Sequence, residues 1–124
     1  MNTITALNQQ FAENSIQFVQ SPEGLPLVVM QHAEGTATVS LYAGQVLSYC
    51  PADRADMKMQ PIFWMSSAAQ FAEGHAIRGG IPLCWPWFGP HSDEEKPKHG
   101  FARTEMWQVV RTSVQADALE LVLT

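Results

Sequence analysis

The sequence feature that most constrains the fold is a period-two alternation of apolar and polar residues between Leu25 and Tyr49. Apolar side chains at every second position of a strand share one face, so such a segment buries one side and exposes the other. Short alternating segments that follow one another across tight turns are typical of an antiparallel meander. The predicted strands are Leu25–Gln31, Thr36–Tyr42 and Gln45–Tyr49, with turns at Glu34-Gly35 and at Gly44.

The segments on either side of this meander have less regular patterns. Ala6–Phe18 has the spacing of a short amphipathic helix, and Ser21-Pro22-Glu23-Gly24 is typical of a turn. We therefore interpret residues 1–24 as a peripheral lead-in and residues 25–124 as the β domain. The remaining expected elements are a polar connection at Pro51–Met59, a buried strand at Ile62–Met65, a short helix at Ser66–Phe71 with a serine N-cap, and strands Trp107–Val114 and Leu119–Leu123 around a turn at Gln115-Ala116-Asp117.

Length and composition exclude several classes of protein. A chain of 124 residues has room for one domain or for part of a larger one, and a hydrophobic content of 46% excludes general disorder. No apolar run approaches the roughly 18 residues of a membrane span, and residues 1–19 lack the features of a signal peptide. Because Cys50 and Cys84 are too few for a disulfide framework, we expect free thiols and a cytoplasmic location.

The distribution of charge is more informative than its sum. The net charge of −5 argues against nonspecific binding to nucleic acid or to a membrane surface. Between residues 78 and 111, however, five Lys and Arg stand against four Asp and Glu, so this window carries +1 and the rest of the chain −6. A locally basic site on an acidic chain suits a small anionic ligand.

The segment Arg78–Arg103 matches neither a helix nor a strand pattern. Gly79-Gly80 permits backbone conformations that are closed to other residues, while prolines fix φ and remove a hydrogen-bond donor. The segment also carries several aromatic residues, which a flexible linker would not. We predict a long ordered loop that forms a functional site. Its prolines are Pro82, Pro86, Pro90 and Pro97.

Four residues of this segment are candidates for ligand binding: Arg78, Lys98, His99 and Arg103. An arginine presents several donors to a phosphate group, and the glycines beside Arg78 let a ligand approach the backbone. A histidine donates from one ring nitrogen while it accepts at the other, so His99 is the best candidate for an acid, a base or a hydrogen-bonding group. The alternatives are an arginine on a solvated loop and a structural histidine.

Two interpretations are open for Trp85, Trp87 and Phe88. Their rings can stack on the apolar face of a sugar, or they can pack as a small core beneath the loop. Packing is the more common role of such residues and is the interpretation we favour.

No metal or cofactor site is predicted. His91, Asp93, Glu94, Glu95 and His99 match no established ligand spacing, and a run of acidic residues is typical of a solvated loop. The sequence also lacks a P-loop, a G-x-G-x-x-G, a C-x-x-C, a G-x-S-x-G and an H-E-x-x-H motif.

Residues 76–103, AIRGGIPLCWPWFGP followed by HGFAR, resemble the signature of the hexose-6-phosphate mutarotases (glucose-6-phosphate 1-epimerases), which are related to aldose 1-epimerase. The upstream segments LYAGQVLSYCPADR and PIFWMSSAAQFAEG are similar to preceding strands of that family, and the resemblance extends over about residues 25–124. It implies an all-β fold, an antiparallel β-sandwich that forms part of a galactose-mutarotase-like supersandwich.

The resemblance also implies a reaction that needs no cofactor, in which the α and β anomers of an aldose 6-phosphate interconvert. A carboxylate takes the proton of the C1 hydroxyl, a histidine protonates the ring oxygen, and the opened sugar closes on its other face. By position, Arg78 and Arg103 match substrate-binding arginines for the phosphate. His99 matches a histidine that contacts the sugar, and Lys98 occupies a position that is a substrate-contacting glutamine in some members.

Members of the family are more than twice this length, and their catalytic histidine and glutamate lie in the C-terminal half. Glu105 and Glu120 occupy ordinary positions, so we expect the catalytic pair beyond Thr124 and little activity in this chain alone. One alternative is a non-catalytic carbohydrate-binding or phosphosugar-binding β module. Another is a sandwich fragment that binds nothing and self-associates through exposed β edges.

Overall fold

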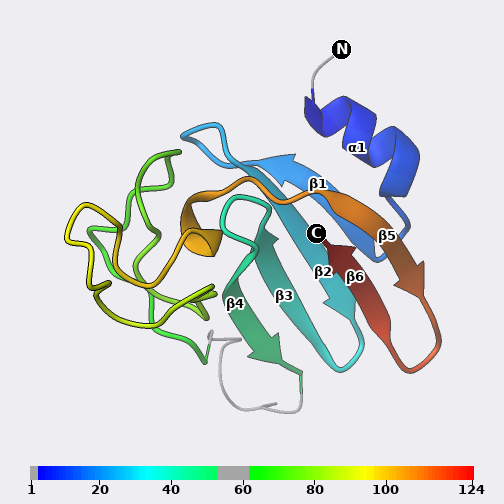
Figure 1. Cartoon of the computed structure of the whole chain (residues 1–124). Coiled ribbons are helices and arrows are strands. Elements are labelled where there is room, and N and C mark those ends of the chain that lie inside the picture. Colours follow the sequence, from blue (N-terminus) through cyan, green and yellow to red (C-terminus); the bar gives the residue numbers. More distant parts are fainter. Residues whose placement is uncertain (1–2, 53–61) are drawn as a thin grey trace.

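The computed structural model describes residues 3–52 and 62–124. Over these residues the chain forms mostly antiparallel β-structure with little helix, which confirms the predicted fold class (Figure 1). None of the helices in the described part is long and apolar enough to cross a membrane. The elements are α1 (Thr3–Phe11), β1 (Ile16–Gln20), β2 (Pro26–His32), β3 (Gly35–Ser40), β4 (Gln45–Pro51), a 3-10 helix η1 (Ala102–Thr104), β5 (Val109–Val114) and β6 (Leu119–Leu123).

The predicted meander is confirmed. Strands β2, β3 and β4 follow one another in a four-stranded antiparallel sheet of order β1-β2-β3-β4. The alternation places Val28 and Val39 opposite each other on the buried face. The register of β3 against β4 shifts between Thr38 and Val39, as it does at a β-bulge.

The predicted helix at Ala6–Phe18 is wrong in its second half. The helix ends at Phe11 instead of continuing to Phe18, and residues 16–20 pair with β2 as a fourth strand. The reason lies in the second half of the segment, where Ile16 and Phe18 alternate with polar residues and become almost fully buried. Strand pairing therefore joins residues 16–20 to the sheet, and Ile16 and Phe18 belong to its core.

Asn8 of α1 covers the outer edge of β1. Its Nδ2 donates to the Phe18 carbonyl at 2.7 Å, and the Phe18 N–H donates back to Oδ1 at 2.9 Å. The amide thus makes the pair of bonds that a further strand would make, so an edge that is otherwise open to association is satisfied within the chain.

The hairpin of β5 and β6 packs across the sheet and forms the second layer. Leu119, Leu121 and Leu123 of β6 contact the cluster of buried side chains on the sheet, and Phe11 of α1 closes the same core. The predicted hairpin is confirmed, with Gln115 N–H donating to the Ala118 carbonyl across the turn. This core consists of Ile16, Phe18, Val28, Val39 and Leu41.

Between β4 and β5 the described chain is largely irregular. The predicted strand at Ile62–Met65 is wrong, because Trp64 is 72% exposed and the segment forms an isolated bridge from Met65 to Gly79 in place of a strand ladder. The predicted helix at Ser66–Phe71 is also wrong: the Ser66 Oγ accepts from Ala68 N–H, but a turn follows and not a helix. Most of the predicted polar connection at Pro51–Met59 lies outside the described residues.

The turn between β3 and β4 holds this irregular segment at its C-terminal end and at Gly74. The Ala43 N–H donates to the Glu105 carbonyl at 2.7 Å, and Trp107 N–H donates to the Leu41 carbonyl at 2.8 Å. On the other side, the hydroxyl of the buried Tyr42 accepts from Gly74 N–H. The meander therefore supports the segment that carries the candidate site.

Candidate functional site

The backbone around Arg78 is held between two neighbouring segments. Ser66 N–H donates to the Arg78 carbonyl and Gly80 N–H donates to the Trp64 carbonyl, both at 2.9 Å. On the opposite side, Ile81 N–H donates to the carbonyl of Val46 in β4 at 2.9 Å. Three backbone contacts thus fix the path of residues 78–81 between the two segments.

Both glycines of this connection are required by the close approach. A Cβ on Gly79 would lie 2.6 Å from the Cα of Met65, and one on Gly80 would meet the Val46 carbonyl oxygen. Both residues also have positive φ, 125° and 63°, which favours glycine. The Gly pair therefore allows the backbone next to Arg78 to lie against the sheet, and this requirement is independent of any ligand.

The Arg78 side chain is exposed and lines a hollow of about 250 Å³. His75 and Gln70 line the same hollow, together with two alanines. A guanidinium beside an imidazole and an amide gives several hydrogen-bond donors in one place, which suits an anionic oxygen.

His99 is held in one orientation by Gly89. The Gly89 N–H donates to the His99 Nδ1 at 2.9 Å, and the His99 N–H donates to the Gly89 carbonyl at 2.9 Å. Because Nδ1 accepts a hydrogen bond, the ring proton of the neutral imidazole is on Nε2. His99 also has a φ of 64°, a conformation that few residues other than glycine adopt. The structure thus presents Nε2 as a donor from a half-buried ring.

Arg103 and Lys98 lie next to this histidine. Arg103 is in η1, and its Nη2 donates to the Lys98 carbonyl at 3.1 Å. The Lys98 side chain is exposed. Within residues 3–52 and 62–124, neither residue forms an ion pair with a carboxylate, and Arg78 forms none either. Their charges are therefore not neutralised by described neighbours, which favours binding of an anion.

The aromatic residues divide into two groups. Trp87 is half-buried: its ring packs edge-on against Phe101 at 4.9 Å between centroids, and its Nε1 donates to the Pro97 carbonyl. Trp85 and Phe88 are 70% and 81% exposed, so the packing interpretation is wrong for these two. The Phe88 ring lies 4.8 Å from the His99 ring. An exposed aromatic surface therefore borders the histidine.

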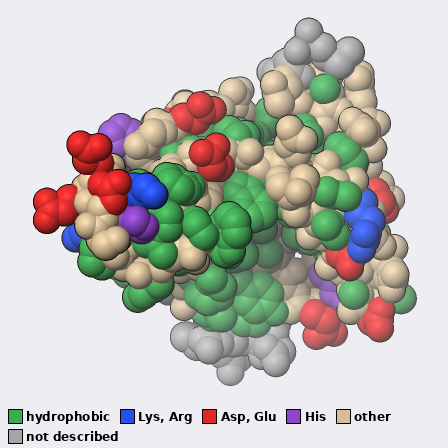
Figure 2. Space-filling model, in the orientation of Figure 1, with side chains coloured by type: hydrophobic (Ala, Val, Ile, Leu, Met, Phe, Trp, Pro, Cys, Tyr) green, Lys and Arg blue, Asp and Glu red, His purple; other side chains and the backbone are tan. Residues whose placement is uncertain are grey.

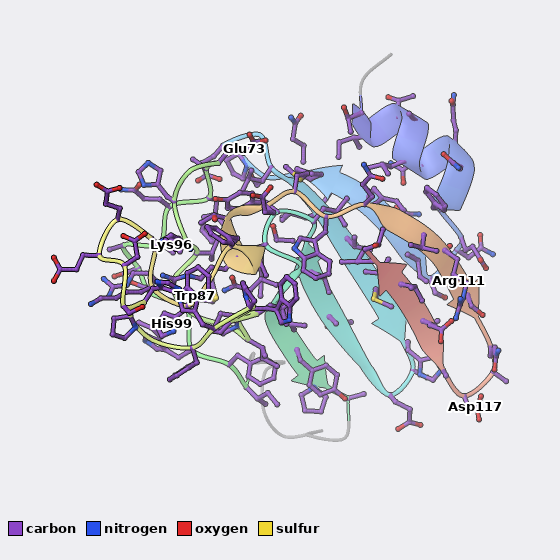
Figure 3. All side chains as sticks on the ribbon, in the orientation of Figure 1. Glu73, Trp87, Lys96, His99, Arg111 and Asp117 are labelled. Atoms are coloured by element: carbon purple, nitrogen blue, oxygen red, sulfur yellow. The ribbon has the colours of Figure 1, made fainter. Side chains whose placement is uncertain are left out.

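Figures 2 and 3 show this arrangement from the same side. Hydrophobic side chains gather over the irregular segment, and acidic side chains lie at its outer tip (Figure 2). Trp87, Lys96 and His99 lie at this end of the molecule, and Arg111 and Asp117 lie at the other end, on the hairpin (Figure 3). Within the described ranges, no three His, Cys, Asp or Glu side chains are grouped so as to hold a metal ion.

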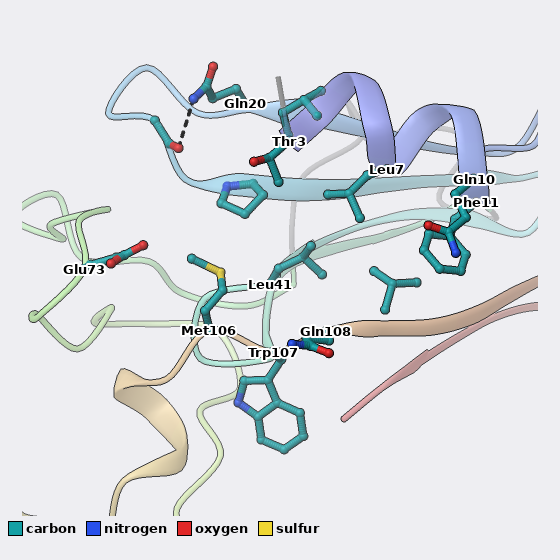
Figure 4. Close-up of a pocket in the computed structure, with 14 residues that line it drawn as sticks. Thr3, Leu7, Gln10, Phe11, Gln20, Leu41, Glu73, Met106, Trp107 and Gln108 are labelled. Carbon is teal, nitrogen blue, oxygen red and sulfur yellow. Dashed lines mark hydrogen bonds between the residues drawn. The ribbon is translucent and has the colours of Figure 1, made fainter. Parts of the chain in front are cut away.

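A separate cleft of about 670 Å³ lies between α1 and the chain at residues 106–109 (Figure 4). None of the four predicted site residues lines it. Its charged lining residue is Glu73, and its other polar side chains are neutral, so it offers no cation for a phosphate. We therefore place the candidate site at the irregular segment and not in this cleft.

The structure brings together three of the four predicted residues, Lys98, His99 and Arg103. Arg78 lines its own hollow, and no contact or cavity given by the described residues joins it to the other three. Two residues beside Arg78 were not predicted, His75 in the same hollow and Gln45, which is bonded to the adjacent carbonyls. His75 precedes Arg78 by three positions, and Gln45 is a polar residue at the start of a predicted strand whose neighbours are apolar; both signals were present in the sequence.

Comparisons with known proteins show the family of the chain. A family model described as aldose 1-epimerase matches residues 26–124. A protein named "Putative glucose-6-phosphate 1-epimerase" from Escherichia coli (strain K12) is 38% identical over 97 residues, which make up 78% of this chain and 31% of that protein. A protein of the same name from Cenchrus ciliaris is 39% identical over 94 residues, 75% of this chain and 26% of that one.

Two solved structures have the same fold. A structure titled "Crystal Structure Analysis of HI1317" superposes with a TM-score of 0.79 at 32% identity, covering 92% of this chain and 39% of that one. The crystal structure of "a putative mutarotase (YeaD) from Salmonella typhimurium" has the same TM-score at 31% identity, covering 90% and 36%. The fold is therefore galactose-mutarotase-like, and the chain spans about a third of the length of the proteins it matches.

The family model covers most of the sequence, and the relatives that carry the epimerase name are 38% and 39% identical over 78% and 75% of it. The chain belongs to the aldose 1-epimerase family.

Proposed function

We propose that this chain carries the substrate-binding part of a mutarotase that interconverts the α and β anomers of a hexose 6-phosphate. The observation that carries the proposal is the group formed by Lys98, His99 and Arg103. Arg103 is bonded to the Lys98 carbonyl, neither cation forms an ion pair among the described residues, and the orientation of the His99 ring is fixed by Gly89. In this proposal Arg78 and Arg103 bind phosphate oxygens, and Lys98 adds a further positive charge. Charge-assisted hydrogen bonds of this kind contribute roughly 1.5–3 kcal/mol each.

His99 contacts the sugar in this proposal. Its Nε2–H donates to a ring or hydroxyl oxygen, and the exposed ring of Phe88 beside it gives an apolar face to the sugar. Mutarotation needs one group that removes the C1 hydroxyl proton and one that protonates the ring oxygen. The same proton count is restored when the ring closes, so no cofactor is consumed.

We propose that this acid and this base lie outside residues 1–124. Glu120 is a poor candidate because its carboxylate is bound by Arg111 on the hairpin, at 2.9 Å. Glu105 is exposed, and no ion pair among the described residues holds its carboxylate in place. The relatives extend over about three times the matched length, which leaves room for further groups. We also propose a cytoplasmic location, in keeping with the free thiols of Cys50 and Cys84.

Calorimetry with glucose 6-phosphate tests the binding role. Arg78→Ala and Arg103→Ala should each weaken binding by about tenfold or more, since each loses charge-assisted bonds to phosphate. Arg111→Ala is the matched control, because this arginine lies on the hairpin at the other end of the molecule (Figure 3). Equal affinities in all four proteins would rule out the two arginines as phosphate ligands.

Exchange between anomers, followed by NMR with glucose 6-phosphate, tests the catalytic part. We expect binding without exchange above the uncatalysed rate. Turnover by this 124-residue chain would refute the proposal that the acid and base lie elsewhere. The alternative is a non-catalytic phosphosugar-binding module, which the exposed rings of Trp85 and Phe88 support. Under this alternative, a protein extended to the full length of the relatives would also bind glucose 6-phosphate without exchanging its anomers.

Self-association is a further proposal. Strand β6 has β5 as its strand neighbour on one side and no strand on the other among the described residues, so its outer edge is open to a second copy. Size-exclusion chromatography with light scattering measures the mass directly. A monomer at high protein concentration would exclude edge pairing.

A further inference from the structure

Gln45 is a buried polar side chain that the proposed reaction does not use. It is 0% exposed and begins β4, beside a cluster of buried apolar residues that includes Ala43 and Leu47. An amide transferred from water into apolar surroundings lowers stability unless it is hydrogen-bonded. A glutamine at this place therefore needs partners that offset its burial.

Its partners are two carbonyl groups on either side of Arg78. The Gln45 Nε2 donates to the Ile77 oxygen at 3.1 Å and to the Gly79 oxygen at 2.5 Å. Because both neighbours are acceptors, only the NH₂ end of the amide can face them. The other end, Oε1, has no hydrogen-bond partner among the described residues, so both bonds of this side chain go to the Arg78 segment.

Other hydrogen bonds also fix the backbone at Arg78, and only its side chain is exposed. Ser66 N–H binds the Arg78 carbonyl, and Gly80 N–H binds the Trp64 carbonyl. Ile77, the residue before Arg78, is buried against Tyr42 and Leu47. The direction in which the Arg78 side chain leaves the backbone is thus set by peptide groups that Gln45 holds.

We propose that Gln45 is a positioning residue for Arg78, which places the guanidinium for an anionic ligand without contacting that ligand. The inference rests on the proposed phosphate-binding role of Arg78. A preorganised arginine binds more tightly because less conformational freedom is lost on binding. Removal of the two bonds from Nε2 frees the peptide groups on both sides of Arg78, so the guanidinium samples more directions.

A double-mutant cycle tests this coupling. Gln45→Met keeps a similar volume and removes both donors. Measured by calorimetry with glucose 6-phosphate, it should weaken binding about tenfold when Arg78 is present and less than about twofold in the Arg78→Ala background. Ser48→Ala, on the same strand, is the control and should leave affinity unchanged. An equal loss in both backgrounds, or no loss with Arg78 present, would overturn the proposal.

Amide hydrogen exchange gives a readout that needs no ligand. In Gln45→Met the amides of Ser66 and Gly80 should exchange about tenfold faster, since the backbone that they contact opens locally. The paired amides of Gln108 and Thr124 at the hairpin serve as the internal reference and should not change. Unchanged exchange at Ser66 and Gly80 would show that Gln45 does not hold the segment.

The two measurements separate this inference from the proposed function. In one outcome, the unmodified chain does not bind glucose 6-phosphate, but amide exchange at Ser66 and Gly80 is faster in Gln45→Met. This result would refute the phosphate-binding role of Arg78 and would still support the role of Gln45 in fixing the Arg78 backbone. If Gln45→Met does not fold, Gln45→Asn keeps the amide but shortens the side chain, so the donors no longer reach both carbonyls. The same outcomes then decide the question.

Discussion

The two sheets and the segment from Ile62 to Met106 are ordered in different ways. In the sheets, consecutive backbone groups pair along each strand, and apolar side chains on alternate positions share one core. In the segment, individual side chains hold individual peptide groups: Gln45 holds two carbonyls, His99 holds Gly89, and Trp87 holds Pro97.

This difference determines how each region should respond to substitution. In the sheets the free energy of folding is distributed over many contacts, so the size of an effect follows the buried area of the side chain. In the segment a single residue is often the sole support of a peptide group, so the identity of that residue matters more than its burial. The site therefore has a precise shape that depends on a few residues.

The largest effect on stability should come from the core of the sheets. Phe18→Ala removes a ring that is 2% exposed and should lower the free energy of unfolding by about 3–5 kcal/mol. Val19→Ala, the next residue on the opposite face and 39% exposed, should change it by less than about 0.5 kcal/mol. Urea denaturation measures both. Similar losses in the two variants would mean that β1 does not contribute its buried face to the core.

A matched pair of glycines tests the segment. Gly89 and Gly100 have nearly the same φ, 78° and 74°, but a Cβ on Gly89 meets nothing within 4 Å, whereas one on Gly100 meets the Trp85 carbonyl. Gly89→Ala should cost about 1–2 kcal/mol from conformational strain alone. Gly100→Ala should cost about 3–4 kcal/mol, because it also displaces the hydrogen bonds that Phe101 and Ala102 donate to Trp85.

Thermal denaturation of the two glycine variants gives the comparison. The difference between them isolates the cost of the close approach from the cost of positive φ. If Gly89→Ala destabilises the chain as much as Gly100→Ala does, then backbone conformation and not contact determines the order of this segment.

A smaller effect is expected at the edge of β1. Asn8→Ala removes the paired bonds to Phe18 and a bond to the Ile4 carbonyl, and should cost about 1–2 kcal/mol after the better helix propensity of alanine is included. Gln9→Ala changes an exposed residue of the same helix and provides the control. Chemical denaturation with equal midpoints for these two variants would contradict the role of Asn8 in covering the edge.

The smallest effect should be at the ion pair on the hairpin. Arg111 and Glu120 are in contact at 2.9 Å, but both side chains are more than half exposed. Arg111→Ala should therefore change the free energy of unfolding by less than about 0.5 kcal/mol. Denaturation at low and at high salt measures this, and a loss above about 1 kcal/mol at low salt would show that the pair contributes more than a surface contact does.

Sequence patterns predicted the strands that pair with their neighbours in the chain across short turns. The alternation in residues 25–49 predicted β2, β3 and β4, and the hairpin of β5 and β6 followed from the same pattern. The pattern failed where local propensity and tertiary contacts disagree. Residues 16–18 continue a helical spacing, yet they pair with β2, and Ile16 and Phe18 are almost fully buried there.

For the site, the sequence by itself determined the residue types: glycines beside Arg78, a histidine beside a lysine, and a segment too rich in proline for regular structure. Tertiary structure decided which of these residues lie together and in which orientation. The tautomer of His99 depends on Gly89, ten positions away, and the backbone of Arg78 depends on Gln45, more than thirty positions away. Hydrogen bonds between groups so far apart in the chain exist only once the sheet has brought them together, so no local pattern could specify them.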